Sequence, residues 1–498
     1  MKASQQELDV IPTEKGECTY VETTVPVVPT SSNDDVDDAS DGHLHVRTCR
    51  SLIAINIIYF AQLVNLVGAG AVSLHHYAQS NTCSELIFVA ASSDNRSPLR
   101  ERQFGVDTWT HHHHNSHNRI YRLPGSRLRG RKWFLVVLTM FGGIGSLVVA
   151  NAKSMGMVTG GFTIMDIAYG TQPLLHAVTS EVIPRRWRGW GQATNMISNS
   201  LGSTVGLIAG GALNRTNDPM SNGFRHFYYM VMGCFLLGAV ICLFVYNPPK
   251  SERQALSTRE KLSRLDWVGY FLLSSGLTLF CVALSLSQNP YTWADPRVSA
   301  PFAVGLGLLI SLAVHETIIK KDGMFHHDLF TFAGNHNFAI CIICVIAEGA
   351  AFFAANSYFV FQISVLYEPD SLLAGLRYTI MFLVAGLGAA FAGYLCAHTR
   401  QTRWLTVSAF MLFIVFFVCM VLTDRTTNRP VWGYPVIMGV ALGITLTTLV
   451  TTAQISTPPR LIALASGLML SSRAIDGAVG LACCTFFPQN AFARILVN

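Results

Sequence analysis

Long apolar runs separated by short polar stretches are the feature that most restricts the fold of this chain. The sequence contains about twelve such runs, and a helix that crosses a bilayer needs about 20 mainly apolar residues. We therefore expect an all-α polytopic membrane protein. The runs lie near residues 52–74, 133–152, 156–178, 190–213, 227–246, 267–287, 301–319, 338–360, 372–395, 404–422, 433–453 and 461–486.

The composition supports a membrane protein. Only 13% of the 498 residues are Asp, Glu, Lys or Arg, whereas a soluble domain carries about 25%. So few charges leave too little polar surface for a water-soluble globule, which excludes soluble enzymes and nucleic-acid binders. The 40 glycines suit helices that pack closely in lipid. The 12 cysteines show no paired spacing and lie mostly in apolar runs, where they act as small apolar residues.

Basic residues between the runs predict how the chain is oriented in the membrane. Lys and Arg collect in cytoplasmic loops, so the net charge of +6 reports on orientation rather than on nucleic-acid binding. The predicted cytoplasmic groups are Arg185, Arg186 and Arg188; Lys250, Arg253, Arg259, Lys261 and Arg264; Lys320 and Lys321; and Arg400 and Arg403.

The first 48 residues are polar and acidic. Such a composition is typical of a disordered tail, and we expect residues 1–48 to be a cytoplasmic one. The tail has no apolar segment near Met1 that would make a cleavable secretory signal. The first apolar run is therefore expected to direct membrane insertion.

Several motifs resemble those of one transporter family. Residues 181–189 (Glu-Val-Ile-Pro-Arg-Arg-Trp-Arg-Gly) resemble a Glu-x-x-Pro-x-x-x-Arg-Gly motif of the major facilitator superfamily, and the glycines of 202–211 resemble its glycine-rich antiporter motif. Residues 264–269 look like the start of the seventh helix in its fourteen-span drug:proton antiporters. Similarity to fungal trichothecene efflux pumps, a branch of those antiporters, lies in residues 266–293, 320–325, 348–349, 457–459 and 465–467.

This resemblance implies a major-facilitator-type fold of two helix bundles with an extra central pair. The drug:proton antiporter branch has fourteen spans, so its second and fourteenth helices are expected to be missing here. Residues 80–129 stand in place of the second helix, are rich in Arg and His and lack periodicity. We therefore expect a gene-model insert there, with a real variant of the protein as the alternative. The implied parts are an N-terminal bundle (49–246), a basic cytoplasmic loop (247–266), a central pair (267–320) and a truncated C-terminal bundle (321–498).

Asp166 and Glu348 are the candidate proton-coupling residues. Each lies midway along an apolar run, where an ionisable side chain is costly and marks a functional site by default. A low dielectric favours the neutral acid, so each could take up a proton on the acidic side and release it inside the cell. The alternative for either residue is a hydrogen-bonded carboxyl that fixes helix packing.

Other polar residues in the spans have more ordinary interpretations. Arg473 and Asp476 are three positions apart on one helix face, and we expect them to neutralise each other. The family usually has glycine where Asp476 stands. We expect His176 to lie in a solvated interface near the cytoplasmic exit, and Arg377 to anchor its helix at the membrane surface.

Other candidate site residues come from the glycine motif, the loop motifs and the aromatic residues. Glycines four positions apart indicate tight helix contact, and the resemblance adds that this face forms the interface between the two bundles, although Leu207 replaces the usual Pro. Aromatic residues in a span are interface anchors or packing residues more often than substrate contacts. The candidates are Gly202, Gly206, Gly210 and Gly211 for helix interfaces; Glu181, Pro184, Arg188, Gly130, Arg131 and Lys132 for cytoplasmic gating; and Phe352, Phe353 and Tyr358 for substrate contact.

These features predict a transporter and not an enzyme. The expected function is proton-coupled efflux of hydrophobic secondary metabolites, mycotoxins or drugs; the alternatives are a siderophore-iron:proton transporter and an inactive truncated relative. Expected partners are the lipid bilayer, a small hydrophobic substrate and protons, with no nucleic acid, obligate protein partner, cofactor or metal. The histidines of 111–117 are read as low-complexity sequence. The expected location is the plasma membrane, with vacuolar or vesicle membranes as alternatives.

Overall fold

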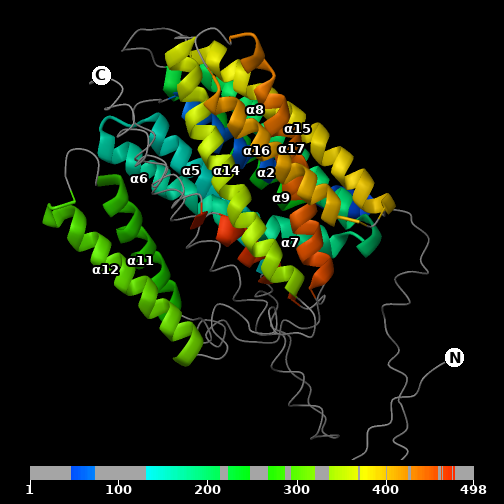
Figure 1. Cartoon of the computed structure of the whole chain (residues 1–498), viewed down its shortest axis with the longest axis horizontal. Coiled ribbons are helices and arrows are strands. Elements are labelled where there is room, and N and C mark those ends of the chain that lie inside the picture. Colours follow the sequence, from blue (N-terminus) through cyan, green and yellow to red (C-terminus); the bar gives the residue numbers. More distant parts are fainter. Residues whose placement is uncertain are drawn as a thin grey trace, which may run out of the picture. The chain divides into compact units, whose positions relative to one another are not determined.

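Helices make up the fold in the part of the chain that the computed structural model describes (Figure 1). The predicted insert 80–129 and the predicted loop 247–266 lie outside that part, as does the tail up to residue 45. The first helix begins at Val46, so the predicted tail boundary at 48 is slightly too late. The described residues are 46–72, 130–213, 223–246, 267–286, 293–319, 336–367, 371–399, 401–423, 428–457, 461–462, 464–473 and 475–476.

Many of these helices are long and apolar enough to cross a membrane. Within the described residues, 9 helices meet that criterion of length and composition, and residues 268–284 form a shorter apolar helix. Their outer faces are apolar as well: Val137, Ile144 and Leu147 form an exposed stripe on one side of a single helix. A stripe of this kind is a liability in water but suits contact with lipid chains.

The first set of helices, called here the N-terminal group, runs from Val46 to Val245. Within it α2 packs along α8, and α5 packs along α9. A core that includes Val64, Met165, Phe227 and Phe235 joins α2, α6 and α9. The members are α2 (Val46–Val72), α5 (Gly130–Ala150), α6 (Met155–Asp166), η1 (Ile167–Thr171), α7 (Gln172–Val182), η2 (Arg185–Trp187), α8 (Arg188–Leu213) and α9 (Gly223–Val245).

The second set, called here the C-terminal group, runs from His336 to Asp476. Its α15 and α17 pack closely because Gly439 and Gly443 have no side chain. A Cβ on Gly439 would collide with the Met381 carbonyl, and one on Gly443 with the Ala385 carbonyl. Leu449 and Leu468 belong to a core that joins α17 to the last helical residues. The members are α14 (His336–Leu366), α15 (Ser371–Thr399), α16 (Arg403–Val421), η4 (Pro430–Trp432), α17 (Tyr434–Ser456) and the helical residues 464–473 and 475–476.

Between the two groups in sequence, α11 (Trp267–Leu286) and α12 (Pro296–Val314) pack against each other. Gly305 allows the close approach, since a Cβ there would lie 2.7 Å from the Phe280 nitrogen. The Asp295 side chain accepts a hydrogen bond from the Arg297 amide at 2.9 Å and so caps the start of α12.

Contact between the two groups is made chiefly by α8 and α15, which run side by side (Figure 1). Small residues line this contact at both ends. A Cβ built on Gly189 would lie 3.1 Å from the Cys396 Cβ, and one built on Gly211 would lie 3.7 Å from the Leu372 Cβ. Since α8 meets α15 over this length, it is the main helix through which one group contacts the other.

The glycine motif of α8 faces two different neighbours. A Cβ on Gly202 would lie 2.5 Å from the Phe60 carbonyl oxygen, and one on Gly206 would lie 2.5 Å from the Val64 carbonyl oxygen. Both contacts are to α2, in the same group, whereas Gly211 faces α15 and Gly210 is buried. The expectation that the whole motif faces the other bundle is therefore wrong for Gly202 and Gly206, because these glycines allow backbone contact with α2.

Candidate functional site

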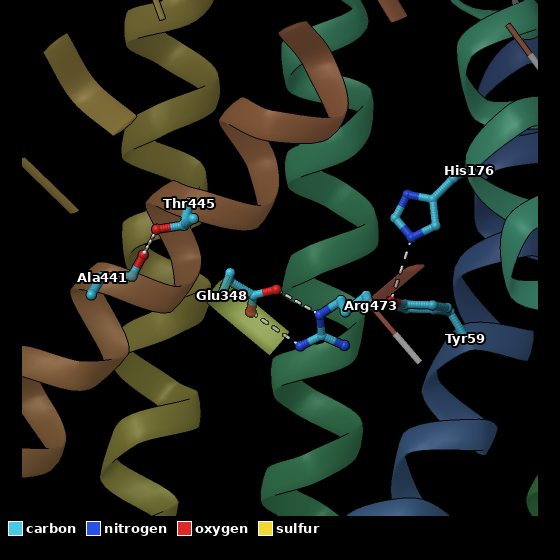
Figure 2. A network of polar contacts seen from close by, with 6 residues as sticks. All are labelled: Tyr59, His176, Glu348, Ala441, Thr445 and Arg473. Carbon is cyan, nitrogen blue, oxygen red and sulfur yellow. Dashed lines mark hydrogen bonds and ion pairs between the residues drawn. The ribbon is translucent and has the colours of Figure 1, made fainter. Parts of the chain in front are cut away.

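A buried ion pair between Glu348 and Arg473 is the centre of the candidate site (Figure 2). Arg473 Nε donates to Glu348 Oε2 at 2.6 Å, and Arg473 Nη2 donates to Glu348 Oε1 at 3.1 Å. The Glu348 side chain is fully buried, while that of Arg473 is 16% exposed. Two parallel N–H···O bonds fix the geometry of the pair and offset part of the cost of burying both charges.

Aromatic rings surround the guanidinium group. Its central carbon lies 4.8 Å from the centroid of the Phe352 ring and 5.7 Å from that of Phe353. Because Phe352 follows Glu348 by one helical turn, α14 supplies the carboxylate and an aromatic face to the same cation. Tyr358 lies further along α14 and is partly buried. Of the predicted substrate-contact residues, Phe352 and Phe353 therefore lie at the ion pair.

Arg473 interacts electrostatically with Asp476, three positions along the helix, but donates its hydrogen bonds to another residue. Arg473 binds Glu348 instead, and Asp476 Oδ2 is buried without a hydrogen-bond partner. Gly349 makes the crossing of these segments close, since a Cβ there would lie 3.1 Å from both the Arg473 carbonyl oxygen and Asp476 Oδ2. The helical spacing did not reveal Glu348 as the main partner, because α14 supplies this carboxylate from 125 residues away.

His176 and Tyr59 bring the N-terminal group to the same place. The Tyr59 hydroxyl lies 3.4 Å from His176 Nε2, and their rings meet edge to face (Figure 2). Arg473 interacts electrostatically with both side chains. His176 is only 3% exposed, so the solvated interface predicted for it is wrong. The ion pair therefore belongs to the C-terminal group but faces polar side chains of the N-terminal group.

Asp166 occupies a different environment, at the end of α6. The run predicted at 156–178 is interrupted there by the 3-10 helix η1. Pro173 accounts for the interruption, because it has no N–H to offer the carbonyl of Tyr169, which bonds to the Gln172 amide instead. The Asp166 side chain is buried and interacts electrostatically with Tyr228 on α9.

Side chains from α2 stabilise this interruption. Gln62 Nε2 donates to the Ala168 carbonyl at 2.8 Å and to Thr171 Oγ1 at 2.6 Å. Asn65 Nδ2 donates to the Tyr169 hydroxyl at 2.9 Å, and that hydroxyl donates to the Gln62 carbonyl. Every one of these partners lies within the N-terminal group. The turn that follows Asp166 is thus stabilised from inside the N-terminal group, whereas the ion pair faces side chains of the other group.

The predicted gating residues lie away from the ion pair in sequence and differ in exposure. Glu181 and Pro184 are exposed, and Arg188 is partly buried at the start of α8. Gly130 begins α5, followed by Arg131 and then Lys132, which is buried. Arg377, predicted as a surface anchor, is buried instead: it donates to Asn428 Oδ1 at 2.8 Å and lies 4.6 Å from the Trp432 ring centroid.

A buried acid with a matched cation between two helix groups can hold or release a proton, and the rings beside it can contact an apolar molecule. Within the described residues, no group of three or more His, Cys, Asp or Glu is placed to hold a metal ion. The histidine run at 111–117 lies outside the described residues.

Comparison with known proteins gives consistent matches. Residues 121–481 match the family model described as Major Facilitator Superfamily. The MFS-type efflux transporter ffsH of Aspergillus flavipes is 25% identical over 336 residues, covering 66% of this chain and 58% of that protein. The trichothecene efflux pump TRI12 of Trichoderma arundinaceum is 22% identical over 199 residues, covering 39% of this chain and 32% of the pump.

A solved structure shows the same fold. The human organic anion transporter MFSD10 (TETRAN) superposes with a TM-score of 0.54 at 15% identity, covering 88% of this chain and 92% of that one. At this identity the match describes the fold alone. The chain spans less than two thirds of the length of ffsH and of two further curated fungal transporters, with 58%, 57% and 65% covered.

Proposed function

Since the chain belongs to the major facilitator superfamily, we propose that it exports small hydrophobic secondary metabolites, mycotoxins or drugs across a membrane in exchange for protons. Relatives named as efflux transporters of fungi support the direction and the substrate class. Transporters of this general kind alternate access to a site near the membrane midplane by moving one half against the other.

The observation that carries the proton coupling is the Glu348–Arg473 pair at the junction of the two groups. While Glu348 is ionised, it holds Arg473 through two hydrogen bonds. Uptake of a proton by this carboxylate removes the negative charge and frees the guanidinium to bind other groups at the junction. Arg473 interacts electrostatically with Tyr59 and His176 of the N-terminal group. A change in the charge of the ion pair therefore alters interactions in both groups.

Apolar substrate contact is proposed for the aromatic face beside the pair. Phe352 and Phe353 pack edge to face, with ring centroids 5.1 Å apart, and both flank Arg473. Large rings give apolar contact area with little loss of side-chain freedom. We propose Phe352 and Phe353 as substrate contacts, with Tyr358 further along α14.

Orientation and location follow from the basic segments. The basic residues 185–188, between α7 and α8, are proposed to face the cytoplasm, as are those of 250–264. The residues predicted for cytoplasmic gating, including Glu181 and Arg188, then lie on that side. The plasma membrane is the proposed location, since transport across it removes a toxin from the cell, with vacuolar and vesicle membranes as the alternatives.

Expression in fungal cells that lack their own efflux pumps tests this proposal. We expect cells with the chain to accumulate less of a hydrophobic toxin, such as a trichothecene, and to lose this protection when a protonophore collapses the proton gradient. The Glu348→Gln variant, at equal abundance in the membrane, should lose the protection. Uptake of a ferric siderophore without toxin export would overturn the proposal and support the siderophore alternative.

A further inference from the structure

A second polar cluster joins the two groups and shares His176 with the surroundings of the ion pair. It contains Gln192 at the start of α8, Gln454 at the end of α17, and Ser466. Gln192 Nε2 donates to Gln454 Oε1 at 3.1 Å, across the boundary between the groups. Gln454 Nε2 donates to the His176 carbonyl at 3.4 Å, also across the boundary, and to Ser466 Oγ at 2.9 Å within its own group.

His176 fixes the orientation of the Gln192 amide. His176 Nδ1 lies 2.6 Å from Gln192 Oε1, which can only accept, so Nδ1 carries the ring proton. The Gln192 Nε2 group then points away from the ring and donates to Ser180 Oγ at 3.1 Å as well as to Gln454. Donors and acceptors thus alternate without conflict from His176 through Gln192 and Gln454 to Ser466.

The two glutamine amides are buried, so they depend on each other and on nearby protein groups for hydrogen bonds. Gln192 and Gln454 are 2% and 0% exposed, so neither amide has water as an alternative partner while the groups are in contact. The surrounding contact is made by small residues: a Cβ on Gly393 would lie 2.8 Å from the Ala193 Cβ. Such contacts are close but carry no directional bonds, so the two glutamines supply the hydrogen bonds that hold this end together.

We propose that Gln192 and Gln454 form a latch that closes the end of the transport path near residues 185–188, with His176 as the residue that positions it. The latch rests on the proposed function, because the proposed orientation makes this the cytoplasmic side, from which an exported substrate enters. Each hydrogen bond is between neutral groups, and water replaces it when the end opens. The latch therefore breaks at small cost, as a repeated transport cycle requires.

A native cysteine offers a direct test of this closure. Cys396 is a free cysteine on α15, and its Cβ lies 3.1 Å from the position of a Cβ on Gly189, one turn before Gln192. Disulfides need Cβ atoms about 3.8 Å apart, so the Gly189→Cys variant should cross-link to Cys396 after a small adjustment while this end is closed. A protease site inserted between residues 247 and 266 reports the bond, because the fragments stay joined only when it has formed.

In that background, Gln192→Leu removes one neutral hydrogen bond across the boundary and should lower the yield of cross-linked protein about fivefold. Gln454→Leu removes two and should lower the yield further. Gln362→Leu is the matched control: this glutamine donates to the Met420 carbonyl inside the C-terminal group, so its loss should leave the yield unchanged. Cys396→Ser should abolish cross-linking. Unchanged yields in both Gln192→Leu and Gln454→Leu would overturn the latch.

Two further measurements separate the latch from folding and from transport. Ser466→Ala removes one partner of Gln454 and should lower the yield less than Gln454→Leu, so a graded response remains measurable if the stronger variant aggregates. Cross-linking needs no substrate. If the substitutions lower the cross-linking yield but the chain exports no toxin, the proposed function is rejected and the latch stands. If the chain exports toxin but none of the three substitutions changes the yield, the latch is rejected and the proposed function stands.

Discussion

Glu348 and Asp166 are both buried carboxylic acids in apolar helices, yet their surroundings differ in one decisive way. Glu348 binds Arg473 within the C-terminal group, and the pair faces Tyr59 and His176 of the N-terminal group. Asp166 lies at the end of α6 beside Tyr228, inside the N-terminal group. Burial alone therefore does not distinguish a carboxylate at a junction from one in the interior of a unit.

The difference matters for any motion of one group against the other. A residue enclosed by its own group keeps its neighbours when that group moves as a body, so its protonation need not change. A residue at the junction changes its neighbours with every such motion. Coupling of a proton to transport requires the second situation, because a group can bias an equilibrium only if its interactions differ between the two states.

The largest effect is expected from removing the cation of the ion pair. Arg473→Met leaves the Glu348 carboxylate buried without its partner, which typically costs about 3–5 kcal/mol of stability. The melting temperature of the protein in detergent should fall sharply. Adding Glu348→Gln should restore most of it, since loss of both charges together is close to neutral. If the double variant is as unstable as Arg473→Met, the unpaired Glu348 carboxylate is not the cause of the lower melting temperature.

The second prediction compares the two carboxylates in transport. Glu348→Gln should abolish toxin export driven by the proton gradient, because an amide cannot take up the proton. Asp166→Asn should leave export measurable, with the remaining activity still dependent on the gradient. Export is measured in fungal cells at matched amounts of each variant in the membrane. The reverse ranking would place coupling in the N-terminal group and reject the junction argument.

The third prediction uses two glycines, one from each region. A Cβ on Gly349 would lie 3.1 Å from Asp476 Oδ2 and from the Arg473 carbonyl, whereas a Cβ on Gly160 of α6 would have nothing within 4 Å. Gly349→Ala should therefore cost about 1–3 kcal/mol of stability by overpacking. Gly160→Ala should be neutral or stabilise by up to about 1 kcal/mol, as alanine favours helix. Equal melting temperatures for the two variants would contradict the close crossing at Gly349.

Apolar patterning was enough to predict the helical class and the positions of most helices, whereas the family resemblance came from short motifs such as that at 181–189. The run predicted at 190–213 matches α8, and the buried positions of Asp166 and Glu348 follow from their place in apolar runs. Pro173 was a readable signal for the interruption of the run at 156–178, and it was missed. The predicted bundle boundaries and the missing helices remain predictions.

Partners across the fold could not be predicted. A helical period tells which side chains share a face, so it suggested Asp476 as the neighbour of Arg473, but it does not say which helix lies opposite. Glu348 is 125 residues from Arg473. For the same reason His176 was expected near solvent, because the sequence shows that it lies close to a basic segment. Its enclosure by Gln192 and Gln454 depends on how the helices pack and could not be predicted.

The smallest expected effect concerns the support of the Asp166 region. Gln62→Leu removes the donors to the Ala168 carbonyl and Thr171 Oγ1 and should cost about 1 kcal/mol, since the carbonyl also accepts a hydrogen bond from Thr171. Tyr59→Phe, on the same helix α2, is its counterpart at the junction and removes the 3.4 Å contact to His176 and the side-chain hydrogen bond to Asn199. If Asp166 serves structure, Gln62→Leu should lower the melting temperature and leave the gradient dependence of export unchanged. Tyr59→Phe should do the opposite, because it alters the surroundings of Arg473 with little loss of packing. A change in gradient dependence for Gln62→Leu alone would return Asp166 to the coupling mechanism.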